Sequence, residues 1–417
     1  MKTTPLYDKD GFIKEFTATV LDCQHVEDGW QVLLDQTGFF PEGGGQTADT
    51  GMLQMTDTES ESQIVSEIMS EPASEAARGI SEKESGEKIV HVLDAQKDGD
   101  VIWHRTDAPI PVGAHVTGTL DWKVRFSKMQ HHSGEHIVSG LINHHFGYNN
   151  VGFHLGSRVV TLDFDGVLTR EQLRQIEYEA NEAVVADLPI LVTYPAREEL
   201  AQIRYRSKIE IEGQVRLVEI PGYDVCACCA PHLHTTGQIG LIKLVNMEHF
   251  RGGVRVYMLC GFAALADYNQ KEDSVRAISQ ALSAREDRVA EAVDKLKQEN
   301  YRQRGEMMAL SNALLECKVE AVQENSERAV FIESGLEGNQ PRELANKLMD
   351  KGVGQVYVFA GNDEAGYRYV LASRSCDMRP VAKEINAALQ GRGGGKPEMV
   401  QGSVACKEEQ IKKFFDC

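Results

Sequence analysis

One long segment constrains the fold of this chain more than any other feature. From about Asp267 to Val322 the sequence contains no proline, and its apolar residues recur at helical spacing. The apolar positions are separated by 3, 4, 7, 4 and 3 residues, a heptad-like pattern formed by Val275, Ile278, Leu282, Val289, Val293 and Leu296. We therefore expect a helical, coiled-coil-like spacer over residues 263–325. An interdomain spacer and a dimerising coiled coil both fit this pattern, and Gly305 is a candidate break into a helical hairpin.

The sequence before the spacer divides at about residue 120. Residues 12–53 and 88–122 are rich in β-branched residues broken by glycine and proline, which predicts a small β-barrel over residues 1–120. Residues 56–88 are rich in serine and glutamate, which is typical of an acidic, poorly ordered insertion, with a short helix as the alternative. Residues 121–262 mix strands with a helix over 124–146 that ends at Gly147 and a helix over 169–186. Thr169 and Gln172 have capping-box spacing at the start of that second helix.

The last part of the chain, residues 326–417, has the pattern of a compact α/β domain. Strands are expected at 330–332 and 356–359, and helices at 341–351 and 381–389, the first with Pro341 in its opening turn. A glycine-rich loop is expected at 391–397. The whole chain of 417 residues is long enough for two or three domains, and its fold class is α+β.

Composition narrows the class of protein. The net charge is −19, of which −14 lies in residues 1–100, so a local basic face that binds RNA remains possible in the rest of the chain. No apolar run approaches the roughly 18 residues of a membrane helix, and the N-terminus has no signal-peptide core, which favours a cytoplasmic protein. The nine cysteines are odd in number and three crowd at 226–229, which favours metal ligands or reactive thiols over a disulfide framework.

Two pairs of residues with helical spacing carry the sharpest chemical signal. His132 and His136 lie four residues apart on the first predicted helix, so both can reach one ion. Cys228 and His232 are also four apart, and thiolate and imidazole ligands in a set of four suit Zn²⁺. The alternatives to these ligands are Cys226 or Cys229 for the thiolate and His131 or His234 for an imidazole.

The same histidine pair also fits a competing motif. His132-x-x-Glu135-His136 matches the H-x-x-E-H pattern of inverzincin metallopeptidases, in which the glutamate is the general base. Gly134 weakens a helix at this point, and a peptidase usually completes its zinc site with a carboxylate, not with a C-x-x-x-H pair. A peptidase is therefore the weaker hypothesis.

Longer motifs resemble a known family. The first segment runs from Asp35 to Gly51 with its F-F-P-E-G-G-G-Q core, and the second runs from Asp121-Trp122 through Arg125 to His132-x-x-x-His136. The third runs from Asp224 through Cys228-x-x-x-His232 to Thr236-Gly-x-Ile-Gly240, and the fourth from Arg251 to Gly261. In this order they resemble the editing domain of alanyl-tRNA synthetase and its free-standing AlaX relatives. The glycine-rich segment from Gly391 to Gly402 resembles the DHH-associated domain at the C-terminus of that synthetase. No DHH motif precedes it, so phosphoesterase chemistry is not implied.

The resemblance implies a trans-editing hydrolase. Because the editing barrel starts at residue 1, with no aminoacylation domain before it, we expect no aminoacylation activity. The expected substrate is tRNA(Ala) mischarged with serine, with glycine as the second candidate. The expected cofactor is one Zn²⁺ per chain held by His132, His136, Cys228 and His232. The alternatives are a catalytically silent tRNA-binding module and a zinc peptidase. A homodimer through the spacer or the C-terminal domain is a further expectation.

The resemblance also gives roles to single residues. The Thr37 hydroxyl is a candidate hydrogen-bond partner of a seryl side chain, and Gln46 is a candidate for positioning water or the ester. A second set of residues is expected to contact the tRNA backbone: Arg125, Arg251, Arg255, Arg392 and Lys396.

Overall fold

The structure of this chain is a computed structural model that describes residues 2–55, 89–156, 159–207 and 213–416. The predicted α+β fold class is confirmed. The chain forms two compact units, Met1–Ser274 and Val275–Cys417, which we describe separately. The predicted acidic insertion, 56–88, lies outside the described residues. Among the helices that the structure describes, none is long and apolar enough to cross a bilayer.

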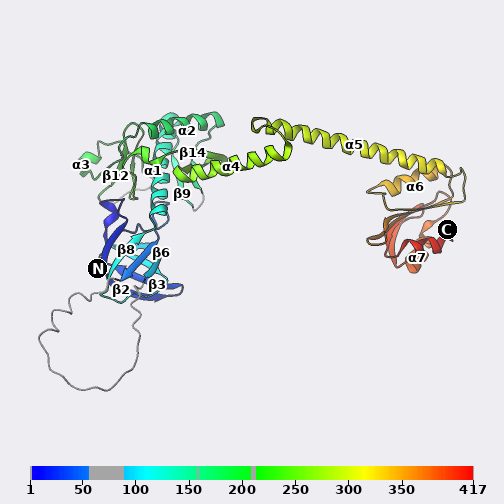
Figure 1. Cartoon of the computed structure of the whole chain (residues 1–417), viewed down its shortest axis with the longest axis horizontal. Helices are drawn as coiled ribbons and strands as arrows, with labels where there is room; N and C mark the ends of the chain where they lie inside the picture. The colour runs from blue at the N-terminus through cyan, green and yellow to red at the C-terminus, as the bar shows by residue number, and fades with distance from the viewer. Residues whose placement is uncertain (1, 56–88, 157–158, 208–212, 417) are drawn as a thin grey trace, which may run out of the picture. The chain divides into compact units, whose positions relative to one another are not determined.

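The first unit begins with the predicted β-barrel (Figure 1). Six antiparallel strands close it in the order β2 (Glu15–Val26), β3 (Gly29–Leu34), β7 (Val101–Thr106), β6 (Ile89–Asp98), β5 (Gly51–Met55) and β8 (His115–Leu120). Alternate residues point inward, as strand geometry requires, and fully bury Val32, Leu34 and Leu53. The short strands β1 (Thr4–Pro5) and β4 (Gln36–Thr37) pair in parallel beside the barrel, and the one-turn η1 (Leu6–Asp8) follows β1.

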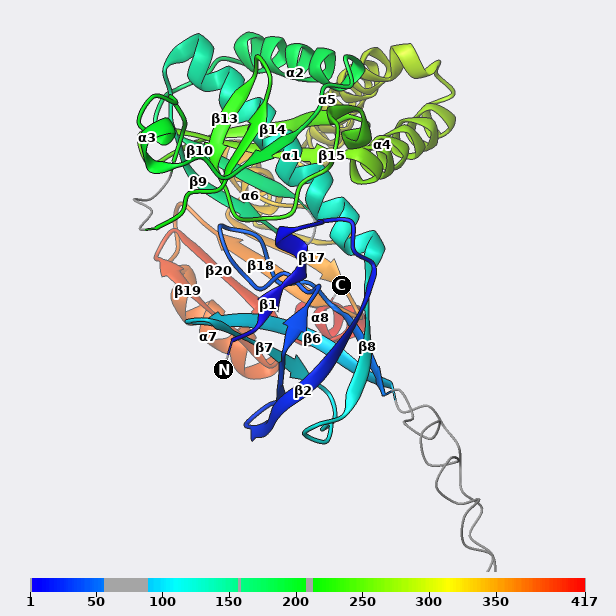
Figure 2. The same cartoon turned by 90° about the vertical axis from the view of Figure 1, so that its left-hand side faces the viewer.

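Helix α1 (Trp122–Phe146) connects the barrel to the second half of this unit (Figure 2). It ends as predicted at Gly147, whose φ of 71° is a left-handed C-cap and whose amide donates to the Asn143 carbonyl. Gly134 lies in the middle of this helix because a Cβ there would come within 2.6 Å of the Cys260 sulfur. The missing side chain lets α1 pack closely against β15 (Gly253–Cys260).

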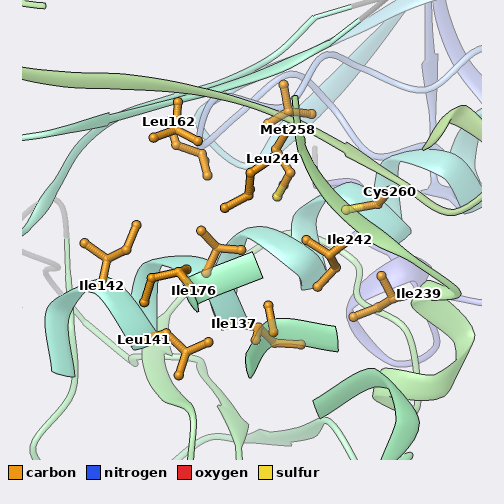
Figure 3. Packing of buried hydrophobic residues seen from close by; sticks show 14 of the residues in the cluster. Ile137, Leu141, Ile142, Leu162, Ile176, Ile239, Ile242, Leu244, Met258 and Cys260 are labelled. Atoms are coloured by element: carbon orange, nitrogen blue, oxygen red, sulfur yellow. The ribbon is translucent and has the colours of Figure 1, made fainter. Parts of the chain in front are cut away.

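A four-stranded antiparallel sheet packs on α1. Its order is β14 (Ile242–Phe250), β15, β10 (Val160–Phe164) and β9 (Asn150–Leu155), and α2 (Arg170–Val185) covers it with the predicted Thr169–Gln172 capping box. Figure 3 shows the shared core, in which Ile137, Leu141 and Ile142 of α1 lie among the residues Ile176, Leu162, Leu244 and Met258. This core fixes the helix that carries the histidine pair.

A smaller sheet carries the cysteine cluster. It contains β11 (Leu191–Thr193), β12 (Leu217–Ile220) and β13 (Asp224–Ala227), all antiparallel. The short helix α3 (Arg197–Leu200) lies between β11 and β12 in sequence, and η2 (Thr236–Ile239) follows β13. Contacts between α1 and both β13 and η2 place Cys228 and His232 beside the histidine pair.

The helical segment breaks at a different residue from the one expected. Helix α4 (Gly261–Leu282) ends at Ser283, whose φ is 49°, and α5 (Val289–Ala321) begins after the one-turn η3 (Glu286–Arg288). The sequence-based break at Gly305 is therefore wrong, because α5 continues through it. Gly305 has open space around it, so the absent side chain costs helix propensity without ending the helix.

The C-terminal domain is a five-stranded mixed sheet with helices. The sheet order is β16 (Arg328–Glu333), β17 (Gln355–Asn362), β18 (Gly366–Ala372), β20 (Met399–Val404) and β19 (Gly391–Lys396), and only β16 and β17 are parallel. The helices are α6 (Gln340–Asp350), α7 (Met378–Ala388) and α8 (Glu408–Phe415), and Pro341 lies in the first turn of α6 as predicted. The expected glycine-rich loop is instead edge strand β19, where a Cβ on Gly393 would come within 2.3 Å of the Tyr369 hydroxyl.

Candidate metal centre

Four side chains from two parts of the first unit come together. One ligand atom from each of His132, His136, Cys228 and His232 lies within 4.8 Å of the others. The Cys228 sulfur lies 3.5 Å from Nε2 of His132 and 3.3 Å from Nε2 of His232. The three histidines are at most 5% exposed. The structure thus gathers the four residues that the sequence indicated as zinc ligands.

Backbone contacts hold the Cys228 and His232 loop in place. After β13, the Cys228 amide donates to the Arg216 carbonyl at 3.1 Å. The Arg216 guanidinium in turn donates to the carbonyls of Cys228 and Ala230. Ala230 is buried, so the loop is anchored on both sides of its thiol.

Each histidine has a partner on its other ring nitrogen. Nδ1 of His132 lies 2.9 Å from Gln46 Oε1, and Nδ1 of His136 lies 3.0 Å from Asp224 Oδ2. An amide or carboxylate oxygen only accepts, so Nδ1 donates in both rings and Nε2 is the atom that faces the group. Nδ1 of His232 lies 3.2 Å from the Ser133 hydroxyl. Partners of this kind orient metal-ligating histidines.

The electrostatics of the group favour a thiolate at Cys228. Burial alone would raise the pKa of this thiol, but the neighbouring His132 and His232 imidazoles hold it well below its usual range. Burial lowers the pKa of His232 to about 3, so its ring is neutral and offers a lone pair. Three imidazoles and one thiolate form a donor set that suits Zn²⁺.

The alternative ligands have other surroundings. Burial raises the pKa of Cys226 to about 11 and also raises that of Cys229, so both remain thiols more readily than Cys228. Nδ1 of His131 lies 2.7 Å from the Ser127 carbonyl, and the His234 ring stacks on Phe12 with centroids 4.0 Å apart. The geometry therefore selects Cys228 among the cysteines that the sequence left open.

A second group of potential metal ligands holds one residue of the first group in place. His136, Asp224 and Cys226 also lie within ligand distance of one another. However, both oxygens of Asp224 already accept from the Arg206 guanidinium, at 2.7 and 2.8 Å. Arg206 therefore fixes the carboxylate that orients His136. Sequence reasoning did not assign a role to Arg206 or Ser133, whose functional signal appears only once the chain is folded.

Glu135 lies next to the metal group, with its Oε2 3.9 Å from Nε2 of His136. Its Oε1 accepts from the Ser139 hydroxyl at 2.7 Å and from the Asn150 amide at 2.6 Å. This carboxylate packs between α1 and β9 and is 2% exposed. The donor set, which is completed by the Cys228 thiolate, argues against the peptidase hypothesis.

Gln46 lies in the glycine-rich loop that precedes β5. Gly45 has a φ of 85°, and a Cβ there would come within 2.3 Å of the Phe153 carbonyl, so only glycine lets the loop approach β9. The Gly45 carbonyl accepts from the Leu155 amide, which secures the loop. Gln46 is fully buried, and its Nε2 has no partner among the described residues. In the structure Gln46 contacts a proposed ligand, His132.

Thr37, in β4, is fully buried against barrel strand β7 and lies outside the group of four. Its hydroxyl is 2.8 Å from Nε2 of His104 and accepts from the Phe39 amide at 3.1 Å. His104 Nδ1 lies 3.2 Å from the Val32 carbonyl, so Nδ1 donates there and Nε2 accepts from Thr37. The Thr37 hydrogen is therefore used within the protein.

Arg125 requires a correction. It is fully buried, its Nε donates to Asp49 Oδ2 at 2.8 Å, and its terminal nitrogens donate to the carbonyls of Gly11 and Gly38. A guanidinium enclosed in this way is not available to a phosphate. Its role is to join α1 to the segment before β2, which contains Gly11, and to the loop after β4, which contains Gly38 and Asp49.

The other arginines are at the surface. Arg251 and Arg255 stand over the ring of Phe250 at 5.0 and 3.8 Å, at the turn between β14 and β15. Arg255 also forms a two-bond ion pair with Asp163. Arg392 and Lys396 are exposed on edge strand β19, in the second unit.

One cavity reaches the metal group. It has a volume of about 810 Å³ and includes His232 in its wall. Its polar lining includes Tyr7, Asp8, Arg216 and His234. Asp8 and Arg216 give this wall side chains of opposite charge.

Comparisons with known proteins find relatives for both units of the chain. Residues 215–277 match the threonyl and alanyl tRNA synthetase second additional domain, tRNA_SAD, and residues 325–416 match the DHHA1 domain. The alanine–tRNA ligase of Pyrococcus abyssi is 30% identical over 97% of this chain and 42% of its own length. The enzyme of Thermococcus kodakarensis is 31% identical over 96% and 42%, and that of Pyrobaculum neutrophilum 29% identical over 99% and 44%.

The matches cover nearly all of this chain but only part of each relative. The chain spans less than half the length of these curated relatives, while nearly all of the chain takes part in each match. The tRNA_SAD match includes Cys228 and His232, and the DHHA1 match includes the whole five-stranded sheet. The chain therefore contains a tRNA_SAD domain followed by a DHHA1 domain, and nearly its whole length is similar to part of the alanine–tRNA ligases.

Proposed function

We propose that this chain is a zinc-dependent hydrolase that cleaves the aminoacyl ester of mischarged tRNA(Ala). Serine is the main misplaced amino acid and glycine the second. The observation that carries the proposal is the group of three oriented imidazoles and one low-pKa thiol, in a chain related along nearly its whole length to alanine–tRNA ligases.

The substrate follows from the energetics of amino-acid selection. A pocket built for alanine rejects an added hydroxyl by only about 10²-fold, and it cannot sterically exclude the smaller glycine. A separate site that hydrolyses the wrong ester supplies the missing accuracy. A hydrolase for such esters must hold the end of a tRNA, so tRNA(Ala) is the proposed partner.

His132, His136, Cys228 and His232 would hold one Zn²⁺. The ion supplies Lewis acidity or a fixed positive charge near the ester. Four protein ligands form a closed set, which is more typical of an ion that orients its surroundings than of one with an open position. Gln46 and Asp224 hold the rings of His132 and His136 in the orientation that this set requires.

We assign substrate binding to one cavity and to basic side chains among the described residues. The cavity at His232 is the proposed entry for the aminoacyl end, with Asp8 and Arg216 as opposite charges in its wall. Arg251 and Arg255 are the proposed backbone contacts of the first unit, and Arg392 and Lys396 those of the second. Arg125 is left out because it is buried.

A catalytically silent tRNA-binding module is the second candidate. The closed set of four protein ligands favours it, because such a set is typical of structural zinc sites. The two candidates differ in one measurable property, since only the hydrolase releases the amino acid.

Deacylation assays test the proposal. Ser-tRNA(Ala), Gly-tRNA(Ala) and Ala-tRNA(Ala) are each incubated with the purified chain, with chelator, and with chelator followed by Zn²⁺. We expect Ser-tRNA(Ala) to be hydrolysed fastest, chelation to stop the reaction, and Zn²⁺ to restore it. His132→Ala is expected to lose both zinc and activity, while His131→Ala, on the same helix but outside the group, keeps both. A zinc-loaded chain that binds tRNA without hydrolysing it would establish the binding module instead.

A further inference from the structure

A second cavity of the first unit contains none of the four proposed zinc ligands. It has a volume of about 570 Å³ and is lined by one face of α1, by residues directly after Gln46 and by barrel strand β6. Its α1 wall consists of Val124, Ser127, Lys128 and His131, at the spacing of a single helical face. A volume of this size is typical of binding sites for small molecules.

Buried charges next to this cavity do not balance. Lys128 and Arg125 are 7% and 0% exposed, and Asp49, which is 1% exposed, lies against both. Arg125 binds Oδ2 of Asp49, whereas Oδ1 lies 3.9 Å from Lys128 Nζ and has no hydrogen-bond partner among the described residues. Two buried cations therefore share one buried anion, and an uncompensated buried charge is costly. The cavity thus favours a ligand with an anionic group.

Lys128 has one ammonium hydrogen available for such a group. An ammonium carries three N–H donors, and two of those on Lys128 are directed at the backbone carbonyls of Thr47 and Ala48. Lys128 also forms part of the cavity wall, so the third donor can reach a carboxylate inside the cavity. A charge-assisted hydrogen bond of this kind is stronger than one between neutral groups.

His131 places a hydrogen-bond acceptor beside this cation. Its Nδ1 donates to the Ser127 carbonyl at 2.7 Å, so Nε2 is the acceptor in the neutral ring. Nε2 has no protein partner among the described residues, although His131 is only 6% exposed. Residues three apart on a helix are neighbours, so one small molecule can contact both Lys128 and His131. The group that meets Nε2 must donate a hydrogen, as an ammonium does.

The rest of the wall combines apolar side chains with charges of both signs. Leu93, Leu155 and Ala263 supply apolar surface, and Asp94 and Lys123 add one carboxylate and one ammonium. A carboxylate in the wall repels a phosphate group but attracts a ligand ammonium. A carboxylate, an ammonium and an apolar portion in one molecule describe an α-amino acid, whereas a nucleotide or an RNA backbone fits this wall poorly.

We propose that this cavity binds one free α-amino acid with an apolar side chain. Its carboxylate contacts Lys128, and its ammonium contacts Asp94 and Nε2 of His131. Its side chain packs against Leu93. This site goes beyond the proposed hydrolysis, which concerns an ester-linked amino acid at the metal group. It nevertheless lies against the same loop, since Lys128 donates to the two carbonyls that directly follow Gln46.

Titration of L-leucine into the zinc-loaded full chain is the first test. Calorimetry and ligand-detected nuclear magnetic resonance are expected to show saturable binding of one molecule per chain. The acid 4-methylpentanoate, which is leucine without its amine, should bind more weakly, and 3-methylbutylamine, which lacks the carboxylate, should not bind. Absence of saturable binding by L-leucine, L-valine and L-alanine would overturn the proposal. Inorganic phosphate that displaces L-leucine more readily than 4-methylpentanoate does would also overturn it, in favour of a general anion site.

A substitution at the exposed end of the cavity locates the bound molecule. Val124 is 38% exposed, and Val124→Asp places a further carboxylate in the wall, which is expected to weaken L-leucine binding by about tenfold through like-charge repulsion. Val167→Asp is the matched control, because Val167 is 49% exposed and does not line the cavity. Zinc content and thermal unfolding establish that both variants are folded. Equal L-leucine affinity in the two variants would place the amino acid elsewhere and contradict the proposal.

His131→Leu tests the contact with the amine separately. The variant removes the Nε2 acceptor and keeps an apolar side chain in its place. We expect its affinity for L-leucine to fall to that for 4-methylpentanoate, while 4-methylpentanoate binds the variant and the unchanged chain alike. A variant that binds L-leucine as tightly as the unchanged chain does would exclude His131 from the site.

Discussion

The side-chain oxygen of Gln46 lies 2.9 Å from Nδ1 of His132, although 86 positions separate the two residues. The contact joins the glycine-rich loop of the barrel to the middle of α1. Because the amide oxygen only accepts, it fixes the proton on Nδ1 and leaves Nε2 facing the Cys228 sulfur, 3.5 Å away. The loop therefore acts on the metal group by orienting one ligand.

This relationship predicts the effect of removing the amide. Gln46→Ala is expected to weaken zinc binding by about 10- to 100-fold, the usual cost of losing a group that orients a metal ligand. Gln46→Glu keeps an acceptor at the same place and should retain most of the affinity. Competition with a coloured chelator measures both. Gln36→Ala is the control, since Gln36 donates to the Thr17 carbonyl away from the group. Equal affinity in all four proteins would show that Gln46 has no part in orienting His132.

A second prediction separates Arg125 from the surface arginines. Arg125→Met removes the guanidinium from buried Asp49 and leaves it the more distant Lys128 and the Phe40 amide, which is expected to lower the free energy of unfolding by about 3 kcal/mol. Denaturant unfolding measures this loss. The affinity of the folded fraction for tRNA should be unchanged, because a buried guanidinium meets no phosphate. A stable variant with weakened tRNA binding would restore the role expected from the sequence.

The surface arginines should behave in the opposite way. Arg251→Ala is expected to weaken tRNA binding and to reduce the slope of log affinity against log salt by about 1, with little change in stability. Arg255→Ala should have a smaller effect, because Asp163 already binds that guanidinium. Filter binding at several salt concentrations measures both slopes, with exposed Arg170→Ala on α2 as the control. Identical slopes in all the proteins would remove this turn from the proposed tRNA surface.

The extent to which the sequence predicts the site depends on whether the relevant contacts are local. His132 with His136 and Cys228 with His232 are each four residues apart, so their shared direction is visible in the sequence. The partners that orient them are distant, as with Gln46. Arg125 shows the same limit, because its burial depends on Asp49, 76 positions away.

The fold also contains elements that local sequence signals predict and elements that they do not. The barrel, α1 and the α2 capping box follow from periodicity and local signals, and the structure agrees with them. Two local signals were misleading. Gly305 does not end α5, since a single glycine costs about 1 kcal/mol in a long helix, and the chain turns at Ser283 instead. The glycines of β19 look like a loop, but a neighbouring tyrosine and strand take up the space of the absent side chains.

The contacts of Thr37 with His104 and Phe39 support a prediction about its substitution. Thr37→Val removes the donor to His104 Nε2 and the acceptor of the Phe39 amide, which is expected to lower the free energy of unfolding by about 2 kcal/mol. Thr37→Ser keeps both bonds and should cost less. The sequence-based role of Thr37 in selecting serine stays a prediction, and the same variants test it. If that role is real, Thr37→Val raises hydrolysis of Ala-tRNA(Ala) relative to Ser-tRNA(Ala).

His104 makes the stability of the first unit depend on pH. Burial lowers the pKa of His104 to about 4, although the hydrogen bond to the Val32 carbonyl opposes the shift. In the unfolded chain the ring titrates near 6.5, so between these values the unfolded state binds more protons. The contribution of His104 is therefore fully present above pH 6.5 and is lost as the pH falls towards 4, by about 3 kcal/mol in total.

Comparison with His104→Gln isolates this contribution from the other titrating groups. The variant should lose less stability than the unchanged chain between pH 7 and pH 4.5, as measured by denaturant unfolding of both proteins in the same buffers. Nuclear magnetic resonance of labelled histidines offers a direct check. The His104 signal is identified by its absence from the spectrum of the variant, and it should show a neutral ring down to about pH 4. A His104 ring that titrates near 6.5 would mean that Thr37 is not held by a neutral imidazole, and the hydrogen bond between them would require another assignment.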